Sequence, residues 1–155
     1  MTRKENALEA FASGLNCAQS VLLAFAEELG LDPEKGLKMA SSFGGGMGAM
    51  GLTCGAVTGA FMVIGLDRGY ASNVDRPAKE AMYGAIQGFA REFTEAHGSI
   101  ACRELLGCDI SSLAGYHEAL EKDLFHTLCP KYVETAVLGG TVHRPCAASI
   151  HRGDR

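Results

Sequence analysis

Apolar residues recur every three or four positions along most of the chain, which is the spacing of helices that bury one face. In the segment after "SGLN" (13–16), for example, Ala18, Val21, Leu22 and Phe25 fall on one side of a helix. The periodic segments and their stop signals predict helices up to residue 12, then over about 16–30, 33–42, 53–68, 75–98, 99–107, 112–122 and 130–138.

Capping residues support several of these boundaries. Asn16 followed by Gln19 forms a capping-box pattern, in which each side chain bonds a free backbone N–H of the other residue. Asp75 before Pro77 is typical of a helix start, and Gly98 is typical of a helix end. Of the short apolar runs, only "FMVIGL" (61–66) has any strand character.

The sequence therefore predicts an all-α fold, as a single compact domain of about six to eight helices with a glycine-rich loop. We expect this domain to cover residues 1–140. Residues 141–155, "TVHRPCAASIHRGDR", lack periodicity and predict an irregular C-terminal tail.

Charge and hydropathy narrow the classes of partner. The net charge is −4, with acidic and basic residues interspersed, so the sequence offers no basic patch for a nucleic acid. Apolar runs are much shorter than the ~20 residues of a membrane span, so we do not expect a membrane-embedded protein. The N-terminus has no signal-peptide pattern, which favours a cytoplasmic location.

The glycine-rich segment 43–60, "FGGGMGAMGLTCGAVTGA", contains a match to G-x-G-x-x-G from Gly46 to Gly51. A dinucleotide-binding loop needs a strand before it and a carboxylate at the end of the next strand. Asp67 lies where that carboxylate would fall, but the residues before Gly44 are helical and no parallel sheet is predicted. We therefore interpret the glycines as clearance and as a hinge that brings Cys54 to its partners.

Cysteines carry the strongest chemical signal, because the chain has six of them at a length that needs no disulfide framework. Four fall at predicted helix starts: Cys17 after Asn16, Cys54 after Thr53, Cys102 in the turn after Ser99, and Cys129 before Pro130. Free N–H groups at a helix start stabilise a thiolate and lower the thiol pKa. The alternative is that these cysteines only fill helix junctions in the core. That interpretation suits Cys108 and Cys146 best.

Four features follow one another along the chain: Asn16-Cys17-Ala18-Gln19-Ser20, Cys54-Gly55-Ala56-Val57-Thr58-Gly59, Cys102 and Cys129. In these features the chain resembles the C_GCAxxG_C_C family over residues 5–140. The resemblance implies a redox-active protein in which Cys17, Cys54, Cys102 and Cys129 are the family cysteines, with Cys108 and Cys146 outside the pattern. It also implies a functional link to a transporter.

Three functions stay open at this point. In the first, the four cysteines perform thiol–disulfide chemistry with a small-molecule or protein redox partner, Cys54 attacking and Cys17 pairing with it. Gly55 and Gly59 would let another backbone or the partner sulfur approach Cys54.

In the second, the same four cysteines bind zinc or an iron–sulfur cluster, joined by His97, His126, Met47 or Met50. In the third, the protein is a non-enzymatic accessory module for a transporter, with a methionine-lined surface formed by Met39, Met47, Met50 and Met62. The sequence leaves open whether the chain forms a homo-oligomer.

Overall fold

A computed structural model describes residues 1–139 of the chain. Within them the fold is all-α and forms one compact domain, as predicted. The helices are α1 (Arg3–Ala12), α2 (Cys17–Ala26), α3 (Pro33–Ser41), α4 (Gly55–Arg68), α5 (Arg76–His97), α6 (Cys102–Leu106), α7 (Leu113–Glu121), α8 (Leu124–Thr127) and α9 (Cys129–Leu138). The predicted tail, 141–155, lies outside the described residues, and so does Cys146.

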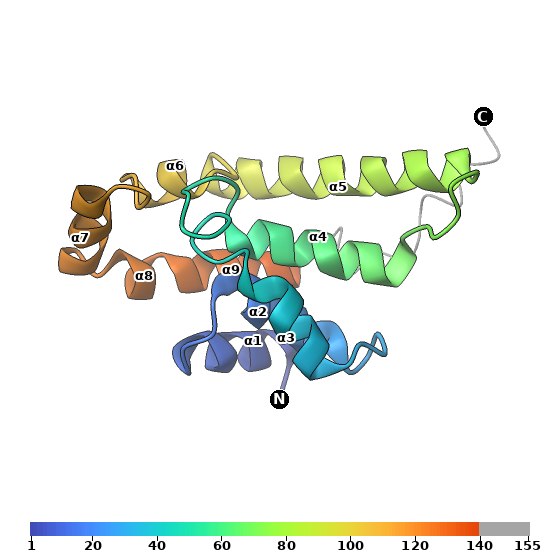
Figure 1. Cartoon of the computed structure of the whole chain (residues 1–155), viewed down its shortest axis with the longest axis horizontal. Helices are drawn as coiled ribbons and strands as arrows, with labels where there is room; N and C mark the ends of the chain where they lie inside the picture. Colours follow the sequence, from blue (N-terminus) through green and yellow to red (C-terminus); the bar gives the residue numbers. More distant parts are fainter. Residues whose placement is uncertain (140–155) are drawn as a thin grey trace.

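The helices lie in three levels, as Figure 1 shows. The long α5 lies along one side, α4 and α9 occupy the middle, and α1, α2 and α3 lie on the opposite side. α2 packs most extensively on α4, and α1, α3 and α9 also pack on α2. The short α6, α7 and α8 gather at one end of this stack.

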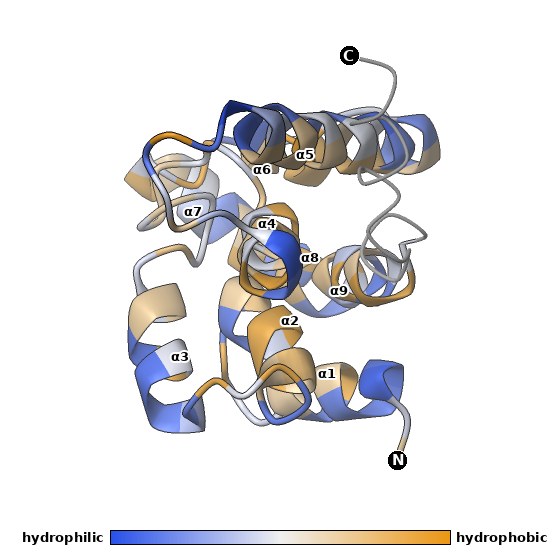
Figure 2. Cartoon of the chain, turned by 90° about the vertical axis from the view of Figure 1, so that its right-hand side faces the viewer, coloured by the Kyte–Doolittle hydropathy of each residue, from blue (hydrophilic) through white to orange (hydrophobic). Residues whose placement is uncertain are grey.

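The core lies where α2, α4 and α9 meet, and Figure 2 shows their hydrophobic faces turned toward one another. Val21, Val57, Ile64 and Val133 are almost fully buried there. A smaller apolar cluster joins α6, α7 and α9 through Leu106, Ile110 and Ala119. Among the described residues, no helix is both long and apolar enough to cross a membrane.

Several predicted caps are confirmed. The Asn16 side chain accepts the Gln19 N–H, and the Gln19 side chain accepts the Asn16 N–H, so α2 begins at Cys17. Asp75 caps α5, and Gly98 ends it in the left-handed conformation at φ 90°. The segment 61–66 belongs to α4 and has no strand character.

Other boundaries differ from the prediction. Thr53 does not cap α4, because it pairs with Ala101 in an isolated antiparallel β-bridge, and Cys54 takes the cap position. The bridge likewise puts Ala101, rather than Ser99, at the cap of α6. α9 begins one residue early, at Cys129, and α8 was not predicted because its four residues are too few to show a period.

Candidate functional site

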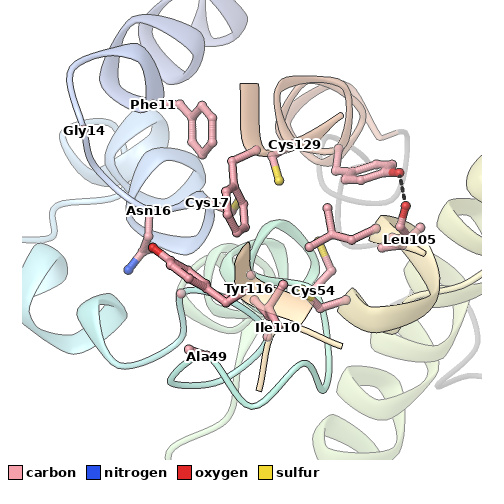
Figure 3. A pocket seen from close by; sticks show the side chains of 18 residues that line it. Phe11, Gly14, Asn16, Cys17, Ala49, Cys54, Leu105, Ile110, Tyr116 and Cys129 are labelled. Atoms are coloured by element: carbon pink, nitrogen blue, oxygen red, sulfur yellow. Dashed lines mark hydrogen bonds between the residues drawn. The ribbon is translucent and has the colours of Figure 1, made fainter. Parts of the chain in front are cut away.

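Four cysteines from four helix starts surround one cavity with a volume of about 390 Å³. Cys17 begins α2, Cys54 caps α4, Cys102 begins α6 and Cys129 begins α9. In Figure 3 the labelled side chains of Cys17, Cys54 and Cys129 come from different elements toward the same hollow. All the cysteines within residues 1–139 are free thiols. The fold thus gathers residues that are widely separated in the chain.

Close contact between α2 and α4 brings Cys17 near the start of α4. A Cβ added to Gly55 would lie 3.1 Å from the Cys17 Cβ and 3.1 Å from the Phe43 carbonyl oxygen. A Cβ added to Gly59 would lie 2.9 Å from the Ala18 carbonyl oxygen. The two glycines thus let the backbone of α2 approach α4 closely just after Cys54, as the sequence predicts.

The β-bridge fixes the starts of α4 and α6 side by side. The Cys54 N–H donates to the Ile100 carbonyl at 2.7 Å, and the Cys102 N–H donates to the Leu52 carbonyl at 2.5 Å. Side chains alternate between the two sides of an extended segment, so these hydrogen bonds place Cys54 and Cys102 on the same side of the bridge. Both line the cavity.

The glycine-rich loop forms one wall of the cavity. Gly45, Gly46 and Gly48 adopt the left-handed conformation at φ 60–68°, and so do the non-glycine residues Met47 and Ala49. A Cβ added to Gly46 would lie 2.6 Å from the Cys102 Cβ. The loop follows α3 and precedes the bridge, with no strand in the described chain before it, so the dinucleotide-loop interpretation fails.

Cys17 and Cys129 interact directly. A hydrogen bond between their side chains raises the pKa of Cys17 and lowers the pKa of Cys129, so the two sulfurs share one proton once the first has been lost. Burial and the neighbouring cysteines raise the pKa of Cys17 further. Burial opposes the lowering at Cys129. The Cys17–Cys129 pair therefore loses its first proton more readily than Cys54 or Cys102.

Cys54 and Cys102 behave differently from the sequence prediction. Burial raises the pKa of Cys54 to about 11, although the N–H groups of Ala56 and Val57 at the helix start act against this shift. Burial, with the charges of the other cysteines, raises the pKa of Cys102 to about 12. The expectation that all four helix starts lower the thiol pKa is therefore wrong for Cys17, Cys54 and Cys102. At these positions the loss of hydration outweighs the stabilisation by backbone N–H groups.

The raised pKa values predict a loss of stability at high pH. In the unfolded chain Cys54 and Cys102 ionise near pH 8.5, whereas in the folded protein they stay protonated up to about pH 11 and 12. Their stabilising contribution is complete below about pH 8.5. It falls by about 1.4 kcal/mol per pH unit for each thiol until the folded pKa is reached.

Urea unfolding of the reduced protein between pH 8 and 10.5 measures this effect. Other groups that titrate in this range are common to every variant, so the comparison is made with Cys54→Ala. We expect its free energy of unfolding to fall less steeply with pH than that of the parent protein. Equal slopes for the two proteins would contradict the prediction.

The histidines and methionines considered as additional ligands lie elsewhere. His97 Nε2 is 2.8 Å from Thr135 Oγ1, and the ring packs on Phe93 and Tyr132. His126 Nδ1 is 2.7 Å from Asp123 Oδ1 at the surface.

Neither histidine lines the cavity, nor do Met47 and Met50. Cys108 is half-buried and also lies outside the lining. Among residues 1–139, no group of three or more His, Cys, Asp or Glu side chains is arranged to hold a metal ion.

Sequence reasoning missed the apolar part of the cavity wall. It consists of Phe11, Leu105, Leu106, Ile110, Tyr116, Phe125 and Tyr132. Tyr132 could have been predicted from the sequence, because it lies one helical turn after Cys129 and so on the same face of the helix. Its hydroxyl donates to the Leu105 carbonyl at 2.9 Å, which ties α9 to α6 (Figure 3). Tyr116 and Phe125 had no such signal, because they reach the cavity only through the placement of α7 and α8.

Comparison with known proteins agrees with this arrangement of cysteines. Residues 15–138 match the family model described as "Putative redox-active protein (C_GCAxxG_C_C)". A protein of Archaeoglobus fulgidus, named "Uncharacterized protein", is 31% identical over 109 residues, which cover 66% of this chain and 72% of that protein. No solved structure matches the chain significantly. Since the family model spans most of the chain and includes all four cavity cysteines, the chain belongs to the C_GCAxxG_C_C family.

Proposed function

We propose that the protein is a thiol–disulfide redox protein in which Cys129 attacks and Cys17 resolves. The observation that carries this proposal is the pairing of Cys17 and Cys129 on the wall of one cavity, where interaction between the two side chains lowers the pKa of Cys129. It favours the thiolate of Cys129, and the thiolate is the form that attacks a disulfide. It also keeps a second thiol within reach of the first.

The proposed reaction has two steps. The Cys129 thiolate attacks one sulfur of a disulfide R–S–S–R′, so that a Cys129–S–S–R bond forms and R′S⁻ leaves. The Cys17 thiol then loses its proton to the leaving thiolate and attacks the Cys129 sulfur, which forms a Cys17–Cys129 disulfide and releases RS⁻. The second thiolate takes a proton from water. The substrate gains two electrons, and the protein dithiol loses two.

Cys54 and Cys102 line the same cavity, and we assign them to the same redox group as the less reactive pair. Their raised pKa values keep them protonated at neutral pH, so they would not compete with Cys129 for the substrate. Because they share the cavity wall with Cys17 and Cys129, we propose that they accept the oxidised state from that pair by thiol–disulfide exchange. The sequence-based choice of Cys54 as the attacker has less support than Cys129 for this reason.

Titration of the reduced protein with a small disulfide under anaerobic conditions tests the proposal. We expect the first equivalent to remove two thiols per chain, and peptide mapping to find Cys17 joined to Cys129. Excess dithiothreitol should restore both thiols. If the native protein keeps all its thiols, or if the first disulfide joins other cysteines, the assignment of Cys129 and Cys17 is wrong.

Binding of zinc or an iron–sulfur cluster by Cys17, Cys54, Cys102 and Cys129 has no support in their arrangement within residues 1–139, and it makes a different prediction. Elemental analysis of protein purified without added metal would then give zinc or iron near one site equivalent per chain. The bound metal would also protect the four thiols from titration until a chelator is added.

A further inference from the structure

The part of the cavity wall formed by residues 1–139 carries no formal charge. Within these residues, none that lines the cavity is Asp, Glu, Lys, Arg or His. Apart from the cysteines, this lining consists of glycine, alanine and large apolar or aromatic side chains, with one amide, Asn16. A charge arises in this part of the wall when a thiol ionises to react.

Charged side chains next to the cavity cysteines in the sequence do not line the cavity. Arg103 directly follows Cys102, but its guanidinium donates to the carbonyls of Gly51 at 3.1 Å and Met50 at 2.9 Å. It also lies 4.0 Å from the Asp109 carboxylate. The arginine charge is thus held by the outer side of the glycine-rich loop.

On the other side of the cavity, Lys131 lies between Pro130 and Tyr132, is exposed and lines a different hollow with His97. Lys122 pairs with Glu118 at 2.7 Å on the exposed part of α7. Neither lysine lines the cavity. A carboxylate that entered would therefore lose water, gain no partner and face the like charge of the thiolate. Of two ammonium groups on one disulfide, at most one could lie beside the thiolate, so the other would lose water without gaining a partner. Such a loss costs several kcal/mol for each ion.

The rim of the cavity is aromatic. Tyr116 is 41% exposed, and its ring centroid lies 5.8 Å from that of Phe125. Phe11 faces the cavity from α1. A cavity of about 390 Å³ is within the range of small-molecule sites. These features favour a small apolar ligand that the rim can cover.

We propose that the cavity selects a small, uncharged disulfide with apolar groups, and that it discriminates against disulfides that carry carboxylates or ammonium groups. This inference rests on the proposed function, because it names the substrate class for the attack by Cys129. The reaction is the balanced exchange given above: two thiols of the protein form a disulfide, and the substrate leaves as two thiols.

Three disulfides of similar size and different charge test this selectivity. They are bis(2-hydroxyethyl) disulfide, which is neutral, cystamine, which is a dication, and 3,3′-dithiodipropionate, which is a dianion. Each rate with the reduced native protein is divided by the rate of the same disulfide with 2-mercaptoethanol, which removes intrinsic reactivity. We expect the normalised rate to be at least about 100-fold higher for the neutral disulfide than for either charged one. Diethyl disulfide should react at least as fast as the hydroxyethyl compound.

A charge added at the rim should change this preference. Ala49 lines the cavity and is exposed, so a long side chain at this position can reach the opening without entering the core. We expect Ala49→Lys to raise the ratio of the dianion rate to the neutral rate by about threefold to tenfold relative to Ala49→Gln, which adds similar length without charge. Leu113→Lys adds the same charge on exposed α7 outside the cavity and should leave the ratio unchanged.

The outcomes separate the two proposals. If none of the disulfides oxidises the native protein, the proposed thiol–disulfide function is wrong. If all react but the normalised rates are equal, or cystamine is the fastest, the function stands and the selectivity for uncharged substrates is wrong. If the same order of rates is found for the chain unfolded in urea, the cavity is not its source, and the selectivity proposal is again overturned.

Discussion

Replacing Cys129 by serine should slow the reaction of the reduced protein with a small uncharged disulfide by at least about 20-fold at pH 7.5. The remaining cavity thiols are poor substitutes, because the pKa of Cys54 is about 11 and the pKa of Cys102 is about 12. Relative to an ordinary thiol near 8.5, Cys54 has a few-hundred-fold less thiolate at neutral pH. The greater nucleophilicity of each remaining thiolate offsets only part of this loss.

Substitutions of Cys17 should have a different effect, since Cys17 acts in the second step. In Cys17→Ser the hydroxyl can still donate to the Cys129 thiolate, so the first step should remain fast. With no resolving thiol, the product should be a stable mixed disulfide that intact-mass spectrometry detects as one adduct per chain. In Cys17→Ala the donor is lost, the pKa of Cys129 should rise, and the pH profile of the first step should shift to higher pH.

Stopped-flow kinetics over pH 6–9.5, followed by peptide mapping, distinguishes these variants. Reactivity rises with pH because the thiolate is the nucleophile. Cys17→Ser should therefore reach its maximum rate at a lower pH than Cys17→Ala. If the two variants have identical pH–rate profiles, the hydrogen bond from residue 17 does not affect the reactivity of Cys129. A Cys129→Ser protein as fast as the parent would remove the role of Cys129.

The second large effect concerns the contact that holds α2 against α4. We expect Gly59→Ala to lower the free energy of unfolding by about 2 kcal/mol, as overpacking of a close helix contact does. A Cβ at Gly59 would lie 2.9 Å from the Ala18 carbonyl oxygen and 3.0 Å from the Val21 Cβ. Ala18 and Val21 are fully buried, so neither can move aside without shifting α2. Gly59→Leu should be destabilised much more.

Gly84→Ala is the matched control for this substitution. Gly84 lies within α5, is exposed, and an added Cβ would meet nothing within 4 Å. The control should raise the free energy of unfolding by about 0.5–1 kcal/mol, because alanine is a better helix former than glycine. Urea unfolding of both variants with the reduced parent gives the comparison. If Gly59→Ala and Gly84→Ala change the free energy of unfolding by the same amount and in the same direction, the close contact at Gly59 is not the cause of the effect.

The close contact at Gly59 should also affect the rate of the thiol–disulfide reaction. α2 carries Cys17 and α4 begins directly after Cys54, so a wider gap between these helices would move both thiols relative to Cys129. We therefore expect Gly59→Ala, even where it folds, to react more slowly with disulfides than Gly84→Ala. Packing at one turn of helix thus affects the geometry of the cysteine cavity.

The sequence by itself determined most of the helices and the start of α2 at Cys17. The capping box of Asn16 and Gln19 places Cys17 at the first position of α2 whatever the rest of the chain does, because it uses only local hydrogen bonds. The same is true of the end of α5 at Gly98. Residues within one helical turn specify such features, so a pattern in the chain is enough to predict them.

Only the tertiary structure decided which thiols ionise readily. Cys17 and Cys129 begin helices that are distant in the chain, and the contact between their side chains links their ionisation. Burial raises the pKa of Cys54 although it lies at a helix start, where local N–H groups favour the thiolate. Desolvation and sulfur–sulfur hydrogen bonds depend on segments that are distant in the chain, and the aromatic rim formed by Tyr116 and Phe125 does as well.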